Sequence, residues 1–219
     1  MQDIIHHPQY VAPQDVQTIK QWYHAVVADD FSGGPHETQH LPAGLTGCWD
    51  RPLRLDREDC PLRPVISRLK QDFGQFDMHN GSVRYLGYPF SVHSDVRSTE
   101  WLQDYQRDHQ RGYTFLIPLS WRADYQPGTA FFSSPPQEGE PLYEECLDVL
   151  PQYTDSHRSL TKNFSVKRIV KWQHAGDLVA WMNFQWHCST SPQGYHYHND
   201  PNLAAKEFIS IETYRPRLG

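Results

Sequence analysis

Residues 82–95 read SVRYLGYPFSVHSD and contain the pattern that decides the fold. Polar and apolar side chains alternate at its two ends, in SVRY at 82–85 and FSVH at 90–93, as they do in a strand that has one buried face. The strand pattern ends at His93, and Asp95 follows two residues later. Because side chains two residues apart on a strand point to the same side, His93 and Asp95 are expected to face one space.

Similar strand patterns occupy most of the remaining chain, whereas the first third is helical. Apolar residues recur every three or four positions after Val11, which predicts a helix up to Asp30. A second helix is predicted to end before Gly74. The sequence therefore predicts a mainly β fold with N-terminal helices, an antiparallel sandwich or barrel. The ranges are 11–30 and 62–73 for the helices, and 45–49, 82–93, 112–119, 128–133, 164–172, 177–188 and 206–214 for the strands.

The length of 219 residues predicts a single domain. A chain of this size can bury roughly 70% of its unfolded surface in one core. We expect residues 1–75 to provide N-terminal helical support and residues 76–219 to form the β core. The segment 135–163 is polar and rich in proline, with one expected helix at 142–150. It is predicted to be an insertion of the kind that often serves as a lid or binding loop.

Composition excludes several classes of function. The net charge of −6 and pI near 6.1 leave no basic footprint for nucleic acid. No apolar run approaches the ~20 residues that span a bilayer, and the N-terminus lacks the pattern of a signal peptide. The four cysteines form no Cys-x-x-Cys pair, so reduced thiols and a cytoplasmic location are expected.

His187 provides a second imidazole at the end of the strand pattern 177–188. Two imidazoles and one carboxylate can occupy one face of an octahedral ion and leave the other face open, as in non-haem Fe(II) sites. With 13 histidines in the chain, one His-x-Asp pair is expected by chance, and a second pair, His198/Asp200, does occur. That pair lies among turn-forming residues and no histidine follows it. The predicted metal ligands are therefore His93, Asp95 and His187.

These motifs resemble the core of the Fe(II)/2-oxoglutarate-dependent oxygenases, from about residue 82 to the C-terminus. The resemblance rests on His93-x-Asp95 at a strand end, LIPL at 116–119, PGTAFF at 127–132, GDLVAW at 176–181 and the distal His187. It implies a double-stranded β-helix, the jelly-roll or cupin-like barrel. It also implies Fe(II), 2-oxoglutarate and O2 as cofactors, with the three residues above as ligands.

The same resemblance implies a cation at the start of the last core strand, which would hold the distal carboxylate of 2-oxoglutarate. Lys206 is the best match, and Ser210 shares its strand face. Lys206 follows His187 at a greater distance than is familiar in this superfamily, so Arg84, Arg122 and Arg215 stay as alternatives. Further expected pocket residues are Tyr85 and Thr114 for the co-substrate, and Arg97, Asn183 and Gln185 for the substrate.

The implied activity is oxidation of a C–H bond, most simply hydroxylation, in a small molecule or a peptidyl residue, with release of succinate and CO2. Two other functions stay open. A cupin-like metal enzyme, such as an isomerase or a dioxygenase without keto acid, would need no cation for a distal carboxylate. A non-catalytic barrel that binds a ligand would hold its histidines too far apart to share one ion. The sequence does not define the substrate or the oligomeric state.

Overall fold

The computed structural model describes residues 4–30, 49–86, 109–110, 112–121, 128–132, 166–183, 185–190 and 206–216. Within these ranges the chain is mostly strand, and both helices precede residue 75, which confirms the predicted class. The helices are α1 (Pro13–Asp30) and α2 (Arg63–Phe73). The strands are β1 (Ile4–His7), β2 (Trp49–Pro52), β3 (Asp77–Leu86), β4 (His109–Gln110), β5 (Tyr113–Pro118), β6 (Gly128–Phe132), β7 (Val166–Lys171), β8 (Leu178–Met182), β9 (His187–Thr190) and β10 (Lys206–Pro216).

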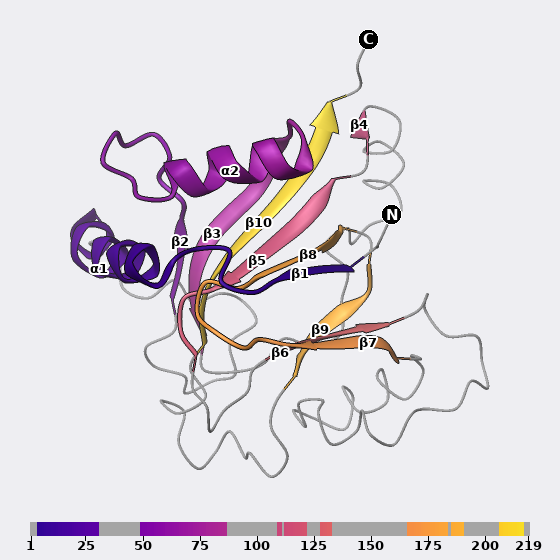
Figure 1. Cartoon of the computed structure of the whole chain (residues 1–219). Coiled ribbons are helices and arrows are strands. Elements are labelled where there is room, and N and C mark those ends of the chain that lie inside the picture. The colour runs from indigo at the N-terminus through magenta and orange to yellow at the C-terminus, as the bar shows by residue number, and fades with distance from the viewer. Residues whose placement is uncertain are drawn as a thin grey trace.

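The strands form a large and a small antiparallel sheet. In the described part of the chain, the large sheet has the order β1-β8-β5-β10-β3-β2, with β4 pairing to β10. The small sheet has the order β7-β6-β9. The two helices lie against one face of the large sheet and the small sheet lies on its other side (Figure 1). This arrangement of two facing sheets is the expected jelly-roll architecture.

The helix-covered face of the large sheet contains the larger hydrophobic core. Alternate residues of β5, namely Tyr113, Phe115 and Ile117, point toward this side and are buried there. The sequence spacing of α1 and α2 places their apolar stripes on the same core. The helix residues in it are Val16, Ile19, Tyr23, Val65, Ile66 and Leu69.

A second hydrophobic core lies between the two sheets, and we call this region the inter-sheet space. Its large-sheet members include Val179 and Trp181 of β8, and its small-sheet members include Phe131 of β6. Leu116 packs against this cluster, whereas its neighbours Phe115 and Ile117 belong to the other core. The alternation along each strand therefore tells which side chains face the inter-sheet space.

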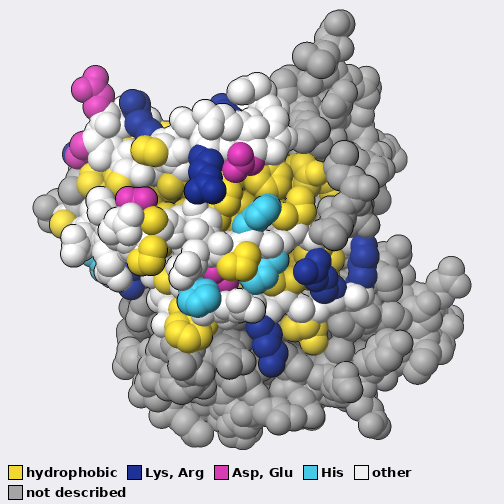
Figure 2. Space-filling view, in the orientation of Figure 1, with side chains coloured by type: hydrophobic (Ala, Val, Ile, Leu, Met, Phe, Trp, Pro, Cys, Tyr) yellow, Lys and Arg dark blue, Asp and Glu magenta, His cyan; other side chains and the backbone are white. Residues whose placement is uncertain are grey.

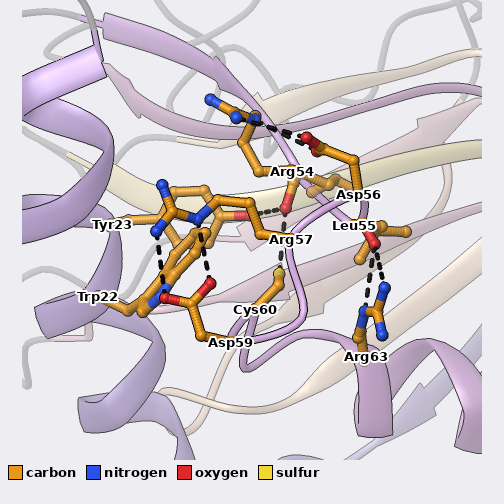
Figure 3. A network of polar contacts seen from close by, with 10 residues as sticks. Trp22, Tyr23, Arg54, Leu55, Asp56, Arg57, Asp59, Cys60 and Arg63 are labelled. Carbon is orange, nitrogen blue, oxygen red and sulfur yellow. Dashed lines mark hydrogen bonds and ion pairs between the residues drawn. The ribbon is translucent and has the colours of Figure 1, made fainter.

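The loop between β2 and α2 fastens α1 to the rest of the fold (Figure 3). Tyr23 donates its buried hydroxyl to the carbonyl of Leu53, and burial raises the pKa of this hydroxyl, which keeps it protonated. Cys60 donates to the same carbonyl at 3.3 Å. Trp22 donates its indole N–H to Asp59, which Arg57 also contacts. These contacts hold α1 against β2 and the loop that follows β2, and Arg51 of β2 adds a bond to the carbonyl of Tyr23 at 2.7 Å.

A buried carboxylate, Asp177, holds the N-terminal strand in place. It is fully buried and accepts hydrogen bonds from His6 at 3.1 Å and from the backbone N–H groups of Gln9 and Gln173 at 2.8 Å. The N–H of His174 adds a fourth donor at 3.2 Å. Histidine side chains are grouped among hydrophobic ones on this face of the molecule (Figure 2).

The stability of the protein is expected to fall at acidic pH partly through Asp177. Burial alone would raise the pKa of this carboxyl, but the donors from Gln9, Gln173 and His6 outweigh it and hold the pKa below its ordinary value. A carboxyl with a lowered pKa stabilises the fold above its unfolded pKa of about 3.9, and this contribution is lost as the pH falls through the folded pKa.

Asp177→Asn is expected to unfold at lower urea concentration than the wild type at pH 7. The cost is about 1.5–3 kcal/mol, the usual value for hydrogen bonds to a charged group. The difference should shrink as the pH is lowered below about 4. Asp56→Asn is the matched control because Asp56 is exposed and its ion pair with Arg54 lies at the surface. An Asp177→Asn deficit that did not change with pH would contradict this account.

One strand expectation is wrong. The pattern 177–188 predicted a single strand, but β8 ends at Met182 and β9 begins at His187, and the two belong to different sheets. The chain turns between them, where the N–H of Gln185 donates to the carbonyl of Met182 at 2.8 Å. A turn interrupts the period-2 alternation, so the alternation of β8 ends at Met182 and does not extend to His187.

The segment before residue 75 also extends the large sheet. β1 pairs with β8 at one edge, and β2 pairs with β3 at the other. Of the strand expected at 45–49, residues 45–48 lie outside the described residues, and Trp49 opens β2. The strand β1 was not predicted. Neither helix of the described ranges is long and apolar enough to cross a membrane.

Candidate functional site

The inter-sheet space is apolar on one side and polar on the other. Near β8 and β7 it contains Trp181, Val179 and Val170. Toward β10 and β3 the alternate positions are Ser210 and Ser82, which are paired in register. Both serines are buried. Strands β10 and β3 therefore form the polar side of this space.

His187 opens β9 and faces the inter-sheet space. It pairs in register with Phe131 of β6, a member of the inter-sheet core. Its ring centroid lies 4.6 Å from that of Trp181 and 6.3 Å from that of Phe131. The side chain is only 6% exposed. The two sheets thus bring the predicted distal histidine against the apolar wall of the space between them.

A hydrogen bond selects the tautomer of His187. Nδ1 lies 2.9 Å from the carbonyl oxygen of Gln185. Because a carbonyl can only accept, Nδ1 must carry the hydrogen and donate it. In the neutral ring the lone pair then belongs to Nε2, the nitrogen that can bind a metal. This arrangement is the one that metal-binding histidines commonly have.

Between Met182 and His187 the chain passes from the large sheet to the small sheet, and we call this stretch the crossing. Asn183 and Gln185, which were predicted to contact substrate, lie in it and both donate to backbone carbonyls. Asn183 is buried and donates Nδ2 to the carbonyl of Thr213 at 2.6 Å. Gln185 donates Nε2 to the carbonyls of Phe132 and, at 3.0 Å, Trp186. These bonds fix the path of the chain into β9. A contact with substrate stays a prediction for both residues.

The strand β10 has a bulge at the residue that Asn183 contacts, Thr213. The register between β10 and β3 shifts at Glu212/Thr213. The buried hydroxyl of Thr213 accepts from the N–H of Tyr113 at 3.0 Å and donates to its carbonyl at 2.8 Å. Gly112 lies so close that an added Cβ would be 1.8 Å from the carbonyl oxygen of Thr213. The N–H of Asn183 also donates to the carbonyl of Gly112 at 3.3 Å.

Arg84 brings a positive charge to the polar side of the inter-sheet space. Val83 belongs to the helix-covered core, so its neighbours Ser82 and Arg84 occupy the opposite face of β3. Nε of Arg84 donates to the hydroxyl of Ser82 at 2.8 Å. Arg84 pairs in register with Phe208, whose ring lies 6.5 Å from that of Trp172 in the inter-sheet core.

The predicted co-substrate residues lie on strands β3, β5 and β10 of the large sheet. Ser210 pairs with Ser82, and Thr114 is buried on the same face of β5 as Leu116. Lys206 opens β10 and shares the alternation of Ser210, but only its backbone is described. Tyr85 pairs in register with Glu207, and it too is described only by its backbone. The co-substrate assignments of all four stay predictions.

The other predicted site residues lie outside the described residues. These include the metal ligands His93 and Asp95. Among the side chains that are described, no group of three His, Cys, Asp or Glu comes together to hold a metal. Arg215 is described by its backbone alone. Also outside are Arg97, Arg122, the pair His198/Asp200 and the expected insertion 135–163.

Sequence reasoning gave little weight to Arg84 and none to Ser82. The signal that could have found them was present, because in the run 82–85 Ser82 and Arg84 alternate with Val83. A polar row beside an apolar row on one strand marks a face that lies against a polar space. The sequence carried no such signal for the carbonyl of Gln185. This carbonyl reaches Nδ1 of His187 only because the chain turns after β8.

No protein-family model matches the sequence, and no curated protein is similar to it in sequence. Solved structures share its fold, which is that of Fe(II)/2-oxoglutarate-dependent oxygenases. The predicted resemblance is therefore confirmed at the level of the fold.

Three of these structures show the range of the fold. The α-ketoglutarate-dependent carbocyclase SnoK of nogalamycin biosynthesis has a TM-score of 0.59 at 10% identity, over 98% of this chain and 80% of its own. The epimerase SnoN, in complex with Fe3+, α-ketoglutarate and nogalamycin RO, has 0.53 at 12% identity, over 98% and 82%. A Trichoplax adhaerens prolyl hydroxylase with a peptide fragment has 0.52 at 12% identity, over 97% and 83%.

Proposed function

We propose that this protein is an Fe(II)- and 2-oxoglutarate-dependent oxygenase that hydroxylates a C–H bond of a small molecule or a peptidyl residue. The observation that carries the proposal is His187. It is buried between the two sheets, and the bond from Nδ1 to the carbonyl of Gln185 assigns the lone pair to Nε2. The fold supports the same proposal, because the epimerase SnoN, which shares it, forms a complex with Fe3+ and α-ketoglutarate.

The chemistry of His187 supports a non-haem iron site. A neutral imidazole whose other nitrogen is fixed by a carbonyl is a suitable ligand for Fe(II). The proposal adds His93 and Asp95 as the other two ligands, because their spacing matches the motif that precedes such a histidine. When bound, iron and 2-oxoglutarate would supply the oxidising power, with release of succinate and CO2. The chain itself would provide the ligands, keep water away from the inter-sheet space and position the substrate.

We further propose Arg84 as the cation for the distal carboxylate of 2-oxoglutarate, in preference to Lys206. The hydrogen bond of its Nε to Ser82 holds the guanidinium on the polar side of the inter-sheet space. A guanidinium held in this way can bind a carboxylate through two parallel hydrogen bonds. The hydroxyls of Ser82 and Ser210, which are paired in register, are positioned to add donors.

The test is anaerobic addition of Fe(II) and then 2-oxoglutarate, followed by visible absorption. The wild type is expected to show the weak charge-transfer band of a chelated keto acid. His187→Ala should lose the band and bind Fe(II) more than about 100-fold less tightly, since loss of an outer-shell partner alone can cost 10–100-fold. His7→Ala is the matched control, because His7 is exposed and contacts the rings of Tyr10 and Phe73.

Other outcomes would favour the other functions. Tight binding of Fe(II) without the band would favour a cupin-like metal enzyme that uses no keto acid. Absence of Fe(II) binding would contradict the proposal and favour a non-catalytic barrel. Admission of oxygen with candidate substrates, followed by mass spectrometry, tests the reaction itself. A product heavier by one oxygen atom supports hydroxylation, whereas an isomer or a cyclised product would show a different outcome of the same oxidation.

A further inference from the structure

Gln185 fastens the crossing between the two sheets at both of its ends. On the large-sheet side its backbone N–H donates to the carbonyl of Met182, the last residue of β8, at 2.8 Å. On the small-sheet side its Nε2 donates to the carbonyl of Phe132, the last residue of β6. The same amide reaches the carbonyl of Trp186 at 3.0 Å. One residue therefore links three separate points of the backbone.

The side chain of Gln185 extends the ladder of the small sheet beyond its last strand pair. The pairing of β6 with β9 ends at Phe131 and His187. Beyond this pair the N–H of Phe132 donates to the carbonyl of Trp186 at 2.9 Å. The carbonyl of Phe132 accepts from Gln185, so a side-chain amide takes the place of a backbone N–H. This bond holds Gln185 at a fixed position beside β6.

The backbone carbonyl of this fixed residue is the acceptor for Nδ1 of His187, at 2.9 Å. We propose that Gln185 is a positioning residue for His187. Its side chain holds the crossing against β6, and its carbonyl selects the Nδ1–H tautomer and directs Nε2 to the inter-sheet space. The part of the inference that concerns the tautomer of His187 is independent of the proposed function. Only the binding of a metal by Nε2 rests on that function.

The chemistry of the amide explains why glutamine suits this position. The acceptors around it are carbonyl oxygens, so the side chain must donate. Glutamate would place negative oxygens against those carbonyls, and leucine would remove the hydrogen bond that Gln185 donates to the carbonyl of Phe132. Either change is expected to loosen the crossing and to free Nδ1 of His187 from its fixed acceptor. The imidazole would then populate both tautomers.

The experiment measures the tautomer of His187 by nitrogen-15 NMR in the metal-free protein, at a pH where the ring is neutral. His187→Ala identifies the resonances among the 13 histidines of the chain. The wild type is expected to carry hydrogen on Nδ1, and Gln185→Leu and Gln185→Glu should shift His187 toward the Nε2–H form. Gln173→Leu is the matched control, because Gln173 is exposed and donates to Asp177 through its backbone N–H, which the substitution keeps.

A wild-type His187 that carries its hydrogen on Nε2 would overturn the inference without any variant. An unchanged tautomer in folded Gln185 variants would overturn it as well, since a purely structural residue would change only the melting temperature. Fe(II) affinity gives a second readout, with an expected loss of about 10–100-fold in the Gln185 variants. If the tautomer shifts as expected but the wild type binds no Fe(II), the inference stands and the proposed function fails.

Discussion

Arg84→Gln is expected to weaken the binding of 2-oxoglutarate to the Fe(II)-loaded protein by about 30-fold or more. Truncating one partner of a buried, hydrogen-bonded charge pair costs about 2–5 kcal/mol, and each 1.4 kcal/mol is tenfold in affinity. We take the lower end because Arg84 is only partly buried. The measurement is titration of the charge-transfer band with 2-oxoglutarate. Arg84→Lys should give an intermediate loss, because it keeps the charge but loses the two-point geometry.

Arg168→Gln is the matched control for this prediction. Arg168 is also a strand arginine, but it lies on β7 and donates Nη1 to the carbonyl of Ile4 at 2.9 Å. Its replacement should leave the titration unchanged, and Fe(II) affinity without 2-oxoglutarate should stay the same in all of these variants. Lys206→Gln completes the series. If that variant lost 2-oxoglutarate affinity while Arg84→Gln kept it, Lys206 would be the anchor and the assignment of Arg84 would be wrong.

Gly112→Ala is expected to destabilise the protein by about 3 kcal/mol or more, which is the upper end of the cost of overpacking. The added Cβ would lie 1.8 Å from the carbonyl oxygen of Thr213 and 2.7 Å from Cα of Tyr214. Both are backbone atoms of the bulged strand β10, so no side chain can move aside. For a domain of this size, the loss corresponds to a fall in melting temperature of roughly 6–12 °C.

Gly81→Ala separates this close approach from the general effect of placing alanine in a strand. The Cβ at position 81 would lie 2.6 Å from Cδ1 of Leu53, the end of a flexible side chain. That side chain can rotate away, and alanine is favoured over glycine in a strand by roughly 0.5–1 kcal/mol. The two effects oppose each other, so a small change is expected. Equal melting temperatures for the two variants would argue against the close contact at Gly112.

The strands and helices that the sequence predicted correctly have one property in common. Each carries its hydrophobic period within the element itself, as in α1 (Pro13–Asp30), α2 (Arg63–Phe73) and β5 (Tyr113–Pro118). Pro64 near the start of α2 and Gly74 at its end, with φ of 85°, mark the bounds of that helix by local chemistry. Such signals do not depend on distant parts of the chain, so they could be recognised from the sequence alone.

The crossing after β8 could not be predicted in the same way. Asn183 and Gln185 fit the alternation of a strand, and nothing local marks the turn between Met182 and His187. The turn is fixed by partners far away in the sequence, such as the carbonyls of Thr213 and Phe132. The contact of His187 with Trp181 has no local signal either. It arises because two sheets face each other, and not because one strand continues.

The large-sheet edge formed by β1 has a consequence for the kinetics of folding. Ile4 pairs with Trp181, and His6 reaches Asp177 across a separation of 171 residues. Trp181 is the ring on which His187 rests. During synthesis the N-terminal strand must therefore wait, without its partner, until most of the chain has left the ribosome. Contacts of such long range are slow to form, because the chain must first close a long loop. Completion of the wall behind His187 is thus expected to be among the last events of folding.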